Sequence, residues 1–177
     1  MDHGPAHAPS FALVFAAHSP LQSIIATAPE ADALVDGFRL EGDWARLLGI
    51  PAHLTLAGPW PLDRELPDER LSRIAAEARG TRYQLDSIDR LGDAICLLPR
   101  DDKPLIDLRA RLLDAVGSSE ASPEWRPHLT IYRGESRDRL ASIRKEIEHA
   151  LPLDCEVEGL YLARLIEPGR AVMEAVR

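Results

Sequence analysis

The sequence predicts an α+β fold of two similar lobes, and three observations lead to this prediction. Short alternating apolar segments, typical of strands, are interleaved with segments of helical periodicity. The order of these segments is nearly the same in the two halves of the chain. Each half also carries one His-x-Thr tripeptide just after a proline, at His53 and at His128. We therefore expect duplicated antiparallel sheets with flanking helices, related by a pseudo-two-fold axis around a central cleft.

The length and composition fit one domain. With 177 residues, 45% of them hydrophobic, the chain can bury a substantial core, whereas two domains would be cramped. We expect residues 1–9 to form a flexible tail and residues 10–177 to form the single domain. Phe11–Ala17 is apolar, but Asp2 precedes it instead of the basic residues of a secretory signal, so we interpret it as the first core strand.

The first half continues with a helical region, the first motif strand and a second helix. Residues 34–48 keep helical spacing, with interruptions near Gly37 and Gly42. Three prolines, at positions 59, 61 and 67, predict a loop after the motif strand. A helix follows, with Asp68 as its cap and Gly80 as its stop.

The second half begins with two paired strands, Tyr83–Ile88 and Asp93–Leu98, joined by a turn at Leu91-Gly92. A helix with Pro104 in its first turn runs from Asp102 to Gly117. The remaining elements are the loop Ser118–Pro123, the second motif strand, a helix capped by Ser136, and strands at Leu153–Glu158, Leu160–Ile166 and Ala171–Val176.

The two tripeptides lie in closely matched contexts, Pro51-Ala52-His53-Leu54-Thr55-Leu56 and Arg126-Pro127-His128-Leu129-Thr130-Ile131. Because strand side chains alternate, the His and Thr of each copy point to one face and the apolar residues to the other. If the two strands are neighbours in one sheet, two imidazoles and two hydroxyls converge on one surface. One copy alone is well explained by a half-buried strand, but two matched copies favour phosphate-ester chemistry.

On these motifs the chain resembles the 2H phosphoesterases, whose bacterial branch is called 2′-5′ RNA ligase or RNA 2′,3′-cyclic phosphodiesterase. That family is defined by two motifs of His, any residue, Thr or Ser, and an apolar residue. The run from Arg126 to Arg133 is similar to the second motif of the bacterial branch, in which an Arg five positions after the His reaches the substrate phosphate. Ala57-Gly58-Pro59-Trp60 is similar to the family's strand end and glycine loop. The resemblance spans nearly the whole chain and implies the 2H phosphoesterase fold.

The resemblance also implies a function, a metal-independent phosphodiesterase that hydrolyses a 2′,3′-cyclic phosphate on an RNA end or a nucleotide, with 2′-5′ RNA ligation as the reverse reaction. Opening the ring requires a base and an acid on opposite sides of phosphorus, and His53 and His128 can divide these roles. Thr55 and Thr130 can donate hydrogen bonds to the phosphate oxygens, and Arg133 can add a charge-assisted pair.

Two other function classes stay open on the sequence alone. One is a non-catalytic module that binds a nucleotide or an RNA end. The other is a metal-dependent hydrolase in which Asp43 or Asp63 joins the histidines. We expect no metal and no cofactor, because the usual zinc and magnesium spacings do not occur. The sequence leaves open which histidine is the acid, and whether the substrate is a tRNA half, a mononucleotide, a 2′-5′ linkage, an ADP-ribose cyclic phosphate or another metabolite.

The charge balance limits the partners. With 29 acidic against 21 basic side chains the net charge is −8, so we expect a short RNA end or a cyclic nucleotide as partner and no long duplex nucleic acid. Arg137 and Arg139 are interpreted as an ordinary solvated helix start. Three aromatic residues near the motifs are candidates either for base stacking or for packing, namely Trp60, Trp125 and Tyr132.

Cellular location and assembly follow from general features. No segment approaches the roughly 20 apolar residues that cross a bilayer, so we expect no membrane association. Cys96 and Cys155 lie in alternating apolar patterns and are interpreted as buried free thiols of a reducing compartment. We therefore expect a cytoplasmic monomer.

Overall fold

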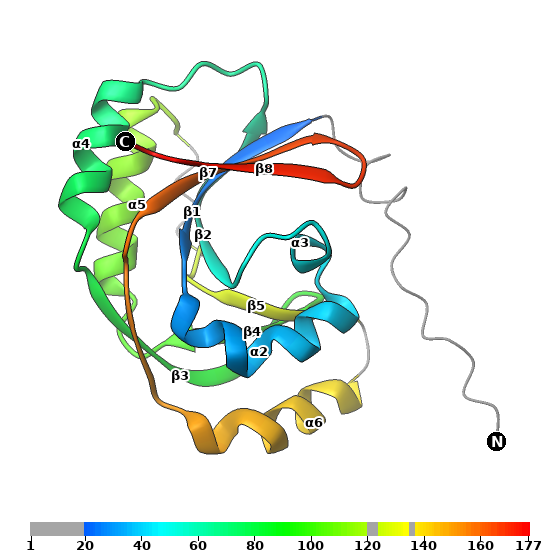
Figure 1. Cartoon of the computed structure of the whole chain (residues 1–177). Coiled ribbons are helices and arrows are strands. Elements are labelled where there is room, and N and C mark those ends of the chain that lie inside the picture. Colours follow the sequence, from blue (N-terminus) through cyan, green and yellow to red (C-terminus); the bar gives the residue numbers. More distant parts are fainter. Residues whose placement is uncertain (1–19, 120–123, 135–136) are drawn as a thin grey trace.

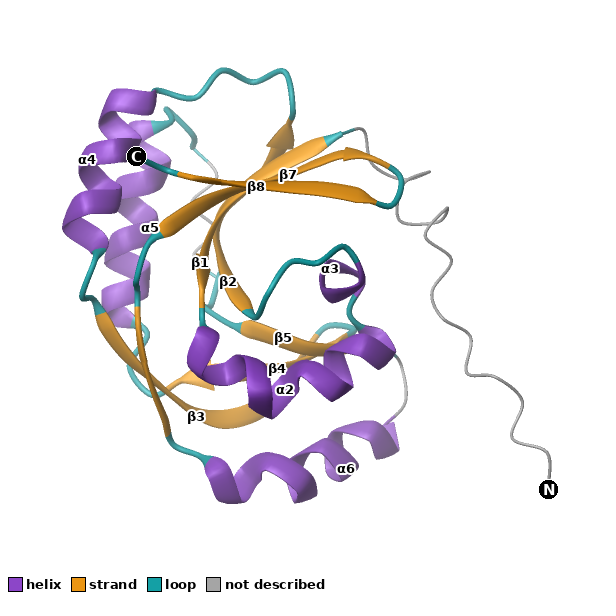
Figure 2. Cartoon of the chain, viewed as in Figure 1, coloured by secondary structure: helices purple, strands orange, loops and turns teal. Residues whose placement is uncertain are grey.

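The computed structural model describes residues 20–119, 124–134 and 137–177, and its fold is α+β (Figures 1 and 2). The strands are β1 (Leu21–Thr27), β2 (His53–Pro61), β3 (Arg82–Leu91), β4 (Ala94–Pro99), β5 (Leu129–Arg133), β6 (Leu153–Glu156), β7 (Leu160–Glu167) and β8 (Arg170–Ala175). The helices are α2 (Pro29–Gly42), α3 (Trp44–Leu47), α4 (Asp68–Ala78), α5 (Lys103–Ala115) and α6 (Arg137–Ile147), followed by the 3₁₀ turn η1 (Glu148–Ala150).

All described strands belong to one eight-stranded antiparallel sheet, in the order β6-β3-β4-β5-β2-β1-β7-β8. Each half of this sheet contains four strands, and the halves join where β2 pairs with β5 through Leu54 and Leu129. The two predicted lobes are therefore continuous, and the two motif strands are neighbours at the centre of the sheet.

Most helices cover the sheet face opposite the motif side chains. The inward residues of the motif strands, such as Leu54 and Leu129, belong to one large core together with residues of α2, α4, α5 and α6. Helices α4 and α5 lie side by side (Figure 2), and α5 contacts strands of both halves of the sheet, β2 and β3. Helix α2 packs on β5 and α5 packs on β2, so each of these helices supports a motif strand. The short helix α3 belongs instead to a second, smaller core, with Ile25 and Ile50.

The structure contains a strand beside the first motif strand that the sequence analysis did not predict. Phe11–Ala17, predicted as the first core strand, lies outside the described residues, and so does the expected tail. On the side away from β5, the neighbour of β2 is β1, which the sequence did not reveal because two register shifts interrupt its pairing with β2 and break the simple alternation. Its Gln22 is buried, and the side-chain amide donates to the Pro61 and Arg64 carbonyls at 3.0 and 2.7 Å.

Several predicted boundaries also change. Strand β2 continues through Pro59 to Pro61, where a loop was predicted, and its Gly58 has a φ of +97° and packs closely on the backbone of β1. Helix α2 runs through Gly37 without interruption and ends at Gly42. Helix α4 begins at Asp68, whose side chain does not cap it, and Asp102 makes no side-chain cap to α5. Ser136, the predicted cap of α6, lies outside the described residues.

The two cysteines are free thiols buried in the fold, as predicted. Burial raises the pKa of Cys96 to about 11 and that of Cys155 to about 12, so both stay protonated at neutral pH. In the part of the chain that the structure describes, no helix is long and apolar enough to cross a membrane.

Candidate active site

The motif side chains converge on one face of the sheet. Continuing the antiparallel register of Leu54 and Leu129 by one residue in each direction sets His53 opposite Thr130 and Thr55 opposite His128. Residues opposite each other share a face, and diagonal neighbours such as the two histidines lie about 7–8 Å apart. All four side chains are half-buried, so they remain accessible while being held by the sheet.

Both imidazoles are oriented by the same local contact. The Nδ1 of His53 lies 2.8 Å from the carbonyl oxygen of Pro51, and the Nδ1 of His128 lies 2.8 Å from that of Arg126. A carbonyl can only accept, so in each ring Nδ1 carries the hydrogen and donates it. In the neutral ring Nε2 is then the unprotonated nitrogen, available to take a proton from a substrate or a water. The two halves of the molecule thus present equivalent bases.

The surroundings favour the neutral form of both rings. Burial lowers the pKa of His53 below its ordinary value of 6.5, and the positive charges of Arg39 and His128 lower it further. The hydrogen bond to Pro51 and the negative charge of Asp43 act in the opposite direction and raise this pKa. The pKa of His128 is lowered by burial and by Arg133, against the bond to Arg126. The mutual effect of the histidines means that a proton on one ring disfavours a proton on the other.

Arg133 reaches the motif face because of an irregularity in β5. Simple alternation would turn it away from His128 and Thr130, since it lies five positions after the histidine. A register shift against β4 occurs between Thr130 and Tyr132, so that Arg133 pairs with Ala94 just as Thr130 pairs with Cys96. Ala94 and Cys96 lie on the same side of β4 and share a small cluster on that side.

The guanidinium of Arg133 is only partly engaged. Its Nη1 lies 3.3 Å from Asp93 Oδ1, and its Nε is buried without a hydrogen-bond partner among the described residues. An unsatisfied buried donor is costly, and an anionic ligand would satisfy it.

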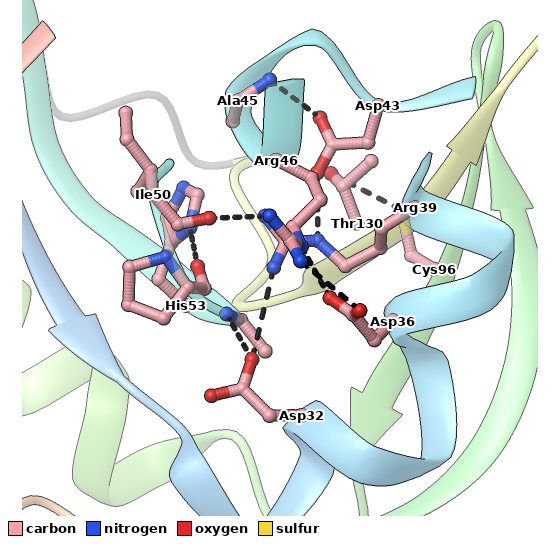
Figure 3. Close-up of polar contacts among 12 residues, drawn as sticks. Asp32, Asp36, Arg39, Asp43, Ala45, Arg46, Ile50, His53, Cys96 and Thr130 are labelled. Atoms are coloured by element: carbon pink, nitrogen blue, oxygen red, sulfur yellow. Dashed lines mark hydrogen bonds and ion pairs between the residues drawn. The ribbon is translucent and has the colours of Figure 1, made fainter. Parts of the chain in front are cut away.

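Behind His53 lies a network of charged residues that the sequence analysis missed (Figure 3). Arg39 and Asp43 are both buried, and Arg39 Nε donates to Asp43 Oδ2 at 2.8 Å. Asp43 also accepts from the Ala45 backbone at 3.2 Å and so caps α3. Arg39 lies four residues after Val35 on the buried side of α2, and only the (i, i+4) spacing to Asp43 could have signalled a pair.

The three aromatic candidates fall in different places. Trp60 is 1% exposed in the large core, so the stacking role considered for it is wrong in this structure, and its packing role holds. Tyr132 pairs with Ile95 and packs against the same core, turned there by the register shift of β5, so it does not lie with the histidines. Trp125 is half-buried, with the guanidinium of Arg109 4.4 Å from its ring centroid.

The carboxylates of the metal hypothesis do not join the histidines. Asp43 is engaged by Arg39 and the α3 backbone, and Asp63 is exposed beyond the end of β2. Among the described residues, no group of three or more His, Cys, Asp and Glu side chains could hold a metal ion. A hollow of about 540 Å³ lies at the β3–β6 edge, away from the central motif strands, and is lined by Arg82, Tyr83, Gln84, Asp154 and Cys155. The candidate site therefore rests on the convergence of the motifs and not on this hollow.

Comparisons with known proteins agree with the fold. Residues 27–168 match the family model described as the 2′-5′ RNA ligase superfamily. The structure is similar to Escherichia coli LigT complexed with NADP⁺, with a TM-score of 0.55, 19% identity, and 90% of this chain and 96% of that chain covered. LigT complexed with 3′-AMP gives a TM-score of 0.56 at 17% identity, covering 90% and 97%. A crystal structure described as a phosphoesterase gives 0.53 at 16% identity, covering 89% and 95%. A search of curated proteins found no match.

Proposed function

Since the chain belongs to the 2′-5′ RNA ligase superfamily, we propose that it is a phosphodiesterase that hydrolyses 2′,3′-cyclic phosphates by two-histidine acid/base catalysis, without a metal. Membership supports a phosphoesterase-type function. The observation that carries the finer proposal is the shared geometry of His53 and His128, each with Nδ1 bonded to the carbonyl two residues before it. This bond directs Nε2 of each ring to the reaction.

The proposed reaction divides the two roles between the rings. One neutral histidine takes a proton from water through Nε2 as the water oxygen attacks phosphorus. The bond from phosphorus to one ribose oxygen breaks on the opposite side, and the other histidine, protonated, gives its Nε2 proton to that oxygen. The products are a phosphomonoester and a free ribose hydroxyl. With a ribose hydroxyl in place of water, the same arrangement forms a 2′-5′ linkage.

Charge that builds on the phosphate needs donors on the same face. Thr55 and Thr130 each offer a hydroxyl beside the opposite histidine, at the positions set by the register. Arg133 adds a cation whose Nε has no hydrogen-bond partner among the described residues. We propose that these three groups hold the non-bridging oxygens, with Trp125 the remaining candidate for stacking on a base.

The substrate class follows from the same site. Two of the similar structures are LigT complexed with NADP⁺ and LigT complexed with 3′-AMP. Both ligands are nucleotides that carry phosphate on or near a ribose. We propose by likeness a short RNA end or a cyclic nucleotide as the substrate of this chain. Its net charge of −8 agrees with a small substrate rather than a long polyanion.

The test is a panel assay with the purified protein. The substrates are a tRNA half ending in a 2′,3′-cyclic phosphate, a 2′,3′-cyclic mononucleotide, a 2′-5′-linked dinucleotide, ADP-ribose 1″,2″-cyclic phosphate and a generic phosphodiester. We expect ring opening of at least one cyclic phosphate, unchanged in excess chelator. No turnover of any substrate would favour a binding module. Loss of turnover with chelator, restored by a divalent cation, would favour the metal-dependent hydrolase instead.

A further inference from the structure

Each half of the molecule contains one buried arginine on the long helix that lies ahead of its motif strand in the chain. Arg39 lies on α2, between β1 and β2, and is 1% exposed; Arg109 lies on α5, between β4 and β5, and is 9% exposed. The sequence analysis gave neither residue a role, and neither belongs to the proposed reaction. A buried charge is costly, and well-packed apolar residues often stabilise a fold as well or better. The duplicated position therefore calls for a function other than stability.

Arg39 binds the segment just before His53 (Figure 3). Its Nη2 donates to the Ile50 carbonyl at 3.0 Å. Its Nη1 is buried, with no hydrogen-bond partner among the described residues, and lies 3.9 Å from Asp32 Oδ1. This same oxygen accepts from the Ala52 backbone at 2.7 Å. Residues on both sides of Pro51 are thus fixed to α2, and the Pro51 carbonyl is the acceptor for Nδ1 of His53.

Arg109 acts at the corresponding segment of the other half. Its guanidinium lies 4.4 Å from the ring centroid of Trp125, three positions before His128, just as Ile50 lies three positions before His53. Its Nη1 also donates to the Leu56 carbonyl of β2 at 2.6 Å, which ties α5 to the first motif strand. The residue after Trp125 is Arg126, whose Nε lies 3.7 Å from Asp102 Oδ2. The Arg126 carbonyl accepts from Nδ1 of His128.

We propose that Arg39 and Arg109 are positioning residues: each holds the segment before its motif, fixes the carbonyl two residues before the histidine, and thereby keeps that ring as the Nδ1–H tautomer with Nε2 facing the substrate. The part of the proposal that concerns substrate rests on the proposed function. The part that concerns the tautomer is independent of any activity.

The tautomer is measured directly by long-range ¹H–¹⁵N NMR of the imidazole rings, at pH 8 where both rings are neutral. In the wild-type protein we expect both motif histidines as the Nδ1–H form. Arg39→Met should convert His53 to a mixture and leave His128 unchanged. Arg109→Met should do the reverse. The matched control is Arg46→Met, since Arg46 is one-third exposed and its guanidinium hydrogen-bonds to Asp36 at the α2–α3 surface.

Kinetics supply the second readout. Misplacing a catalytic group by a remote change costs up to about 100-fold in rate. We therefore expect Arg39→Met to lower kcat by about 10- to 100-fold with KM within about twofold, because Arg39 is not proposed to touch the substrate. Arg109→Met should lower kcat over the same range and also raise KM for substrates that carry a base, because Arg109 contacts Trp125, the candidate for base stacking. A variant that raised KM and kept kcat would contradict a positioning role.

Folding is controlled by a second variant, because Arg39→Met leaves Asp43 buried and unpaired. The double variant Arg39→Met/Asp43→Asn removes both charges. A folded double variant in which His53 keeps the wild-type tautomer would overturn the proposal. If the wild-type protein opens no cyclic phosphate, the proposed function fails, yet the NMR result still decides the positioning role, so the two failures are distinguishable.

Discussion

At the scale of single residues, His53 and His128 are equivalent in their hydrogen bond, their half-burial and the direction of their pKa shift. In the proposed reaction, equivalent rings can exchange the roles of acid and base between the formation and the cleavage of a 2′-5′ linkage, because the base of one direction is the acid of the reverse direction. Neither ring can then be dispensed with.

We expect His53→Ala and His128→Ala each to lower kcat by roughly 100-fold or more, the loss typical of a positioned acid or base. The double variant should be little worse than either single, because the two rings act as a unit. Steady-state turnover of the preferred cyclic phosphate measures this. His149→Ala, at an exposed position in η1, is the control and should keep full turnover. Near-normal turnover of either single variant would rule out the two-histidine mechanism.

Arg133 should contribute to substrate binding. Arg133→Ala removes the cation at the motif face, so we expect a raised KM, about 10-fold or more for a charge-assisted contact of 1.5–3 kcal/mol. Arg139→Ala is the control, because Arg139 pairs with Glu41 and stacks on Phe38 and Tyr132. Its KM should stay within about twofold of wild type. Equal effects in the two variants would contradict the specific role of Arg133.

At the scale of elements, helix α2 and strand β5 meet at Gly42. A Cβ at this position would lie 2.3 Å from the ring of Tyr132. We expect Gly42→Ala to lower the free energy of unfolding by about 1–3 kcal/mol, as overpacking does. Gly37→Ala in the same helix meets nothing within 4 Å and should raise stability by up to about 1 kcal/mol. Urea denaturation measures both. Gly42→Ala should lower the free energy of unfolding by less in a Tyr132→Ala background than in the wild-type protein, because the ring that the new methyl group meets is then absent.

The elements also explain what the sequence could predict. That His and Thr share one face of each motif strand was predictable, because period-2 alternation needs only local sequence. Their convergence also needed the pairing of β2 with β5, which the sequence analysis could state only as a condition. The inward turn of Tyr132 and the outward turn of Arg133 were not predictable, since both depend on a register shift against β4 that leaves no local signal. The same holds for β1, whose shifts against β2 disguise its alternation.

The buried pair of Arg39 and Asp43 was unpredictable for a different reason. Charged residues on a helix usually face solvent, so their pattern indicates an exposed surface. The packing of α2 on β5 and α3, which are tertiary contacts, buries this part of the helix.

At the scale of the whole molecule, the two lowered histidine pKa values set the dependence on pH. The profile of kcat/KM reports the free enzyme, and its maximum lies between the two pKa values. Both lie below 6.5, so we expect a bell-shaped profile with its maximum below pH 6.5. Bound phosphate, being anionic, should move the kcat profile to higher pH. A kcat/KM profile that rises through pH 7.5 would contradict this expectation.

The same shifts predict how stability responds to acid. A histidine with a lowered pKa in the folded state binds fewer protons there than in the unfolded state. Its contribution to the free energy of unfolding is therefore present above pH 6.5, and it is lost progressively as the pH falls from 6.5 toward the pKa of the folded state. We expect the urea midpoint to fall between pH 7 and pH 5, and to fall less in His53→Ala.

The acidic surface predicts a weak dependence on salt. Binding to a single strand loses affinity with a logarithmic slope of about −0.7 per phosphate contact. With a net charge of −8 and only the terminal phosphate held, we expect a slope corresponding to about one or two contacts. Catalytic efficiency on a short cyclic-phosphate oligonucleotide, across a salt series, measures it. A slope worth four or more contacts would indicate an extended RNA track.

The strand order has a consequence for synthesis of the chain. In the finished sheet, β1 and β2 are flanked by β7 and β5. Both partners emerge from the ribosome long after β1 and β2, and pairings so distant in sequence form slowly. Until then the nascent chain carries two apolar strand edges with unpaired backbone groups, which are the features that promote aggregation. The two histidines thus come together late in folding, and β1 and β2 must stay soluble until β5 and β7 pair with them.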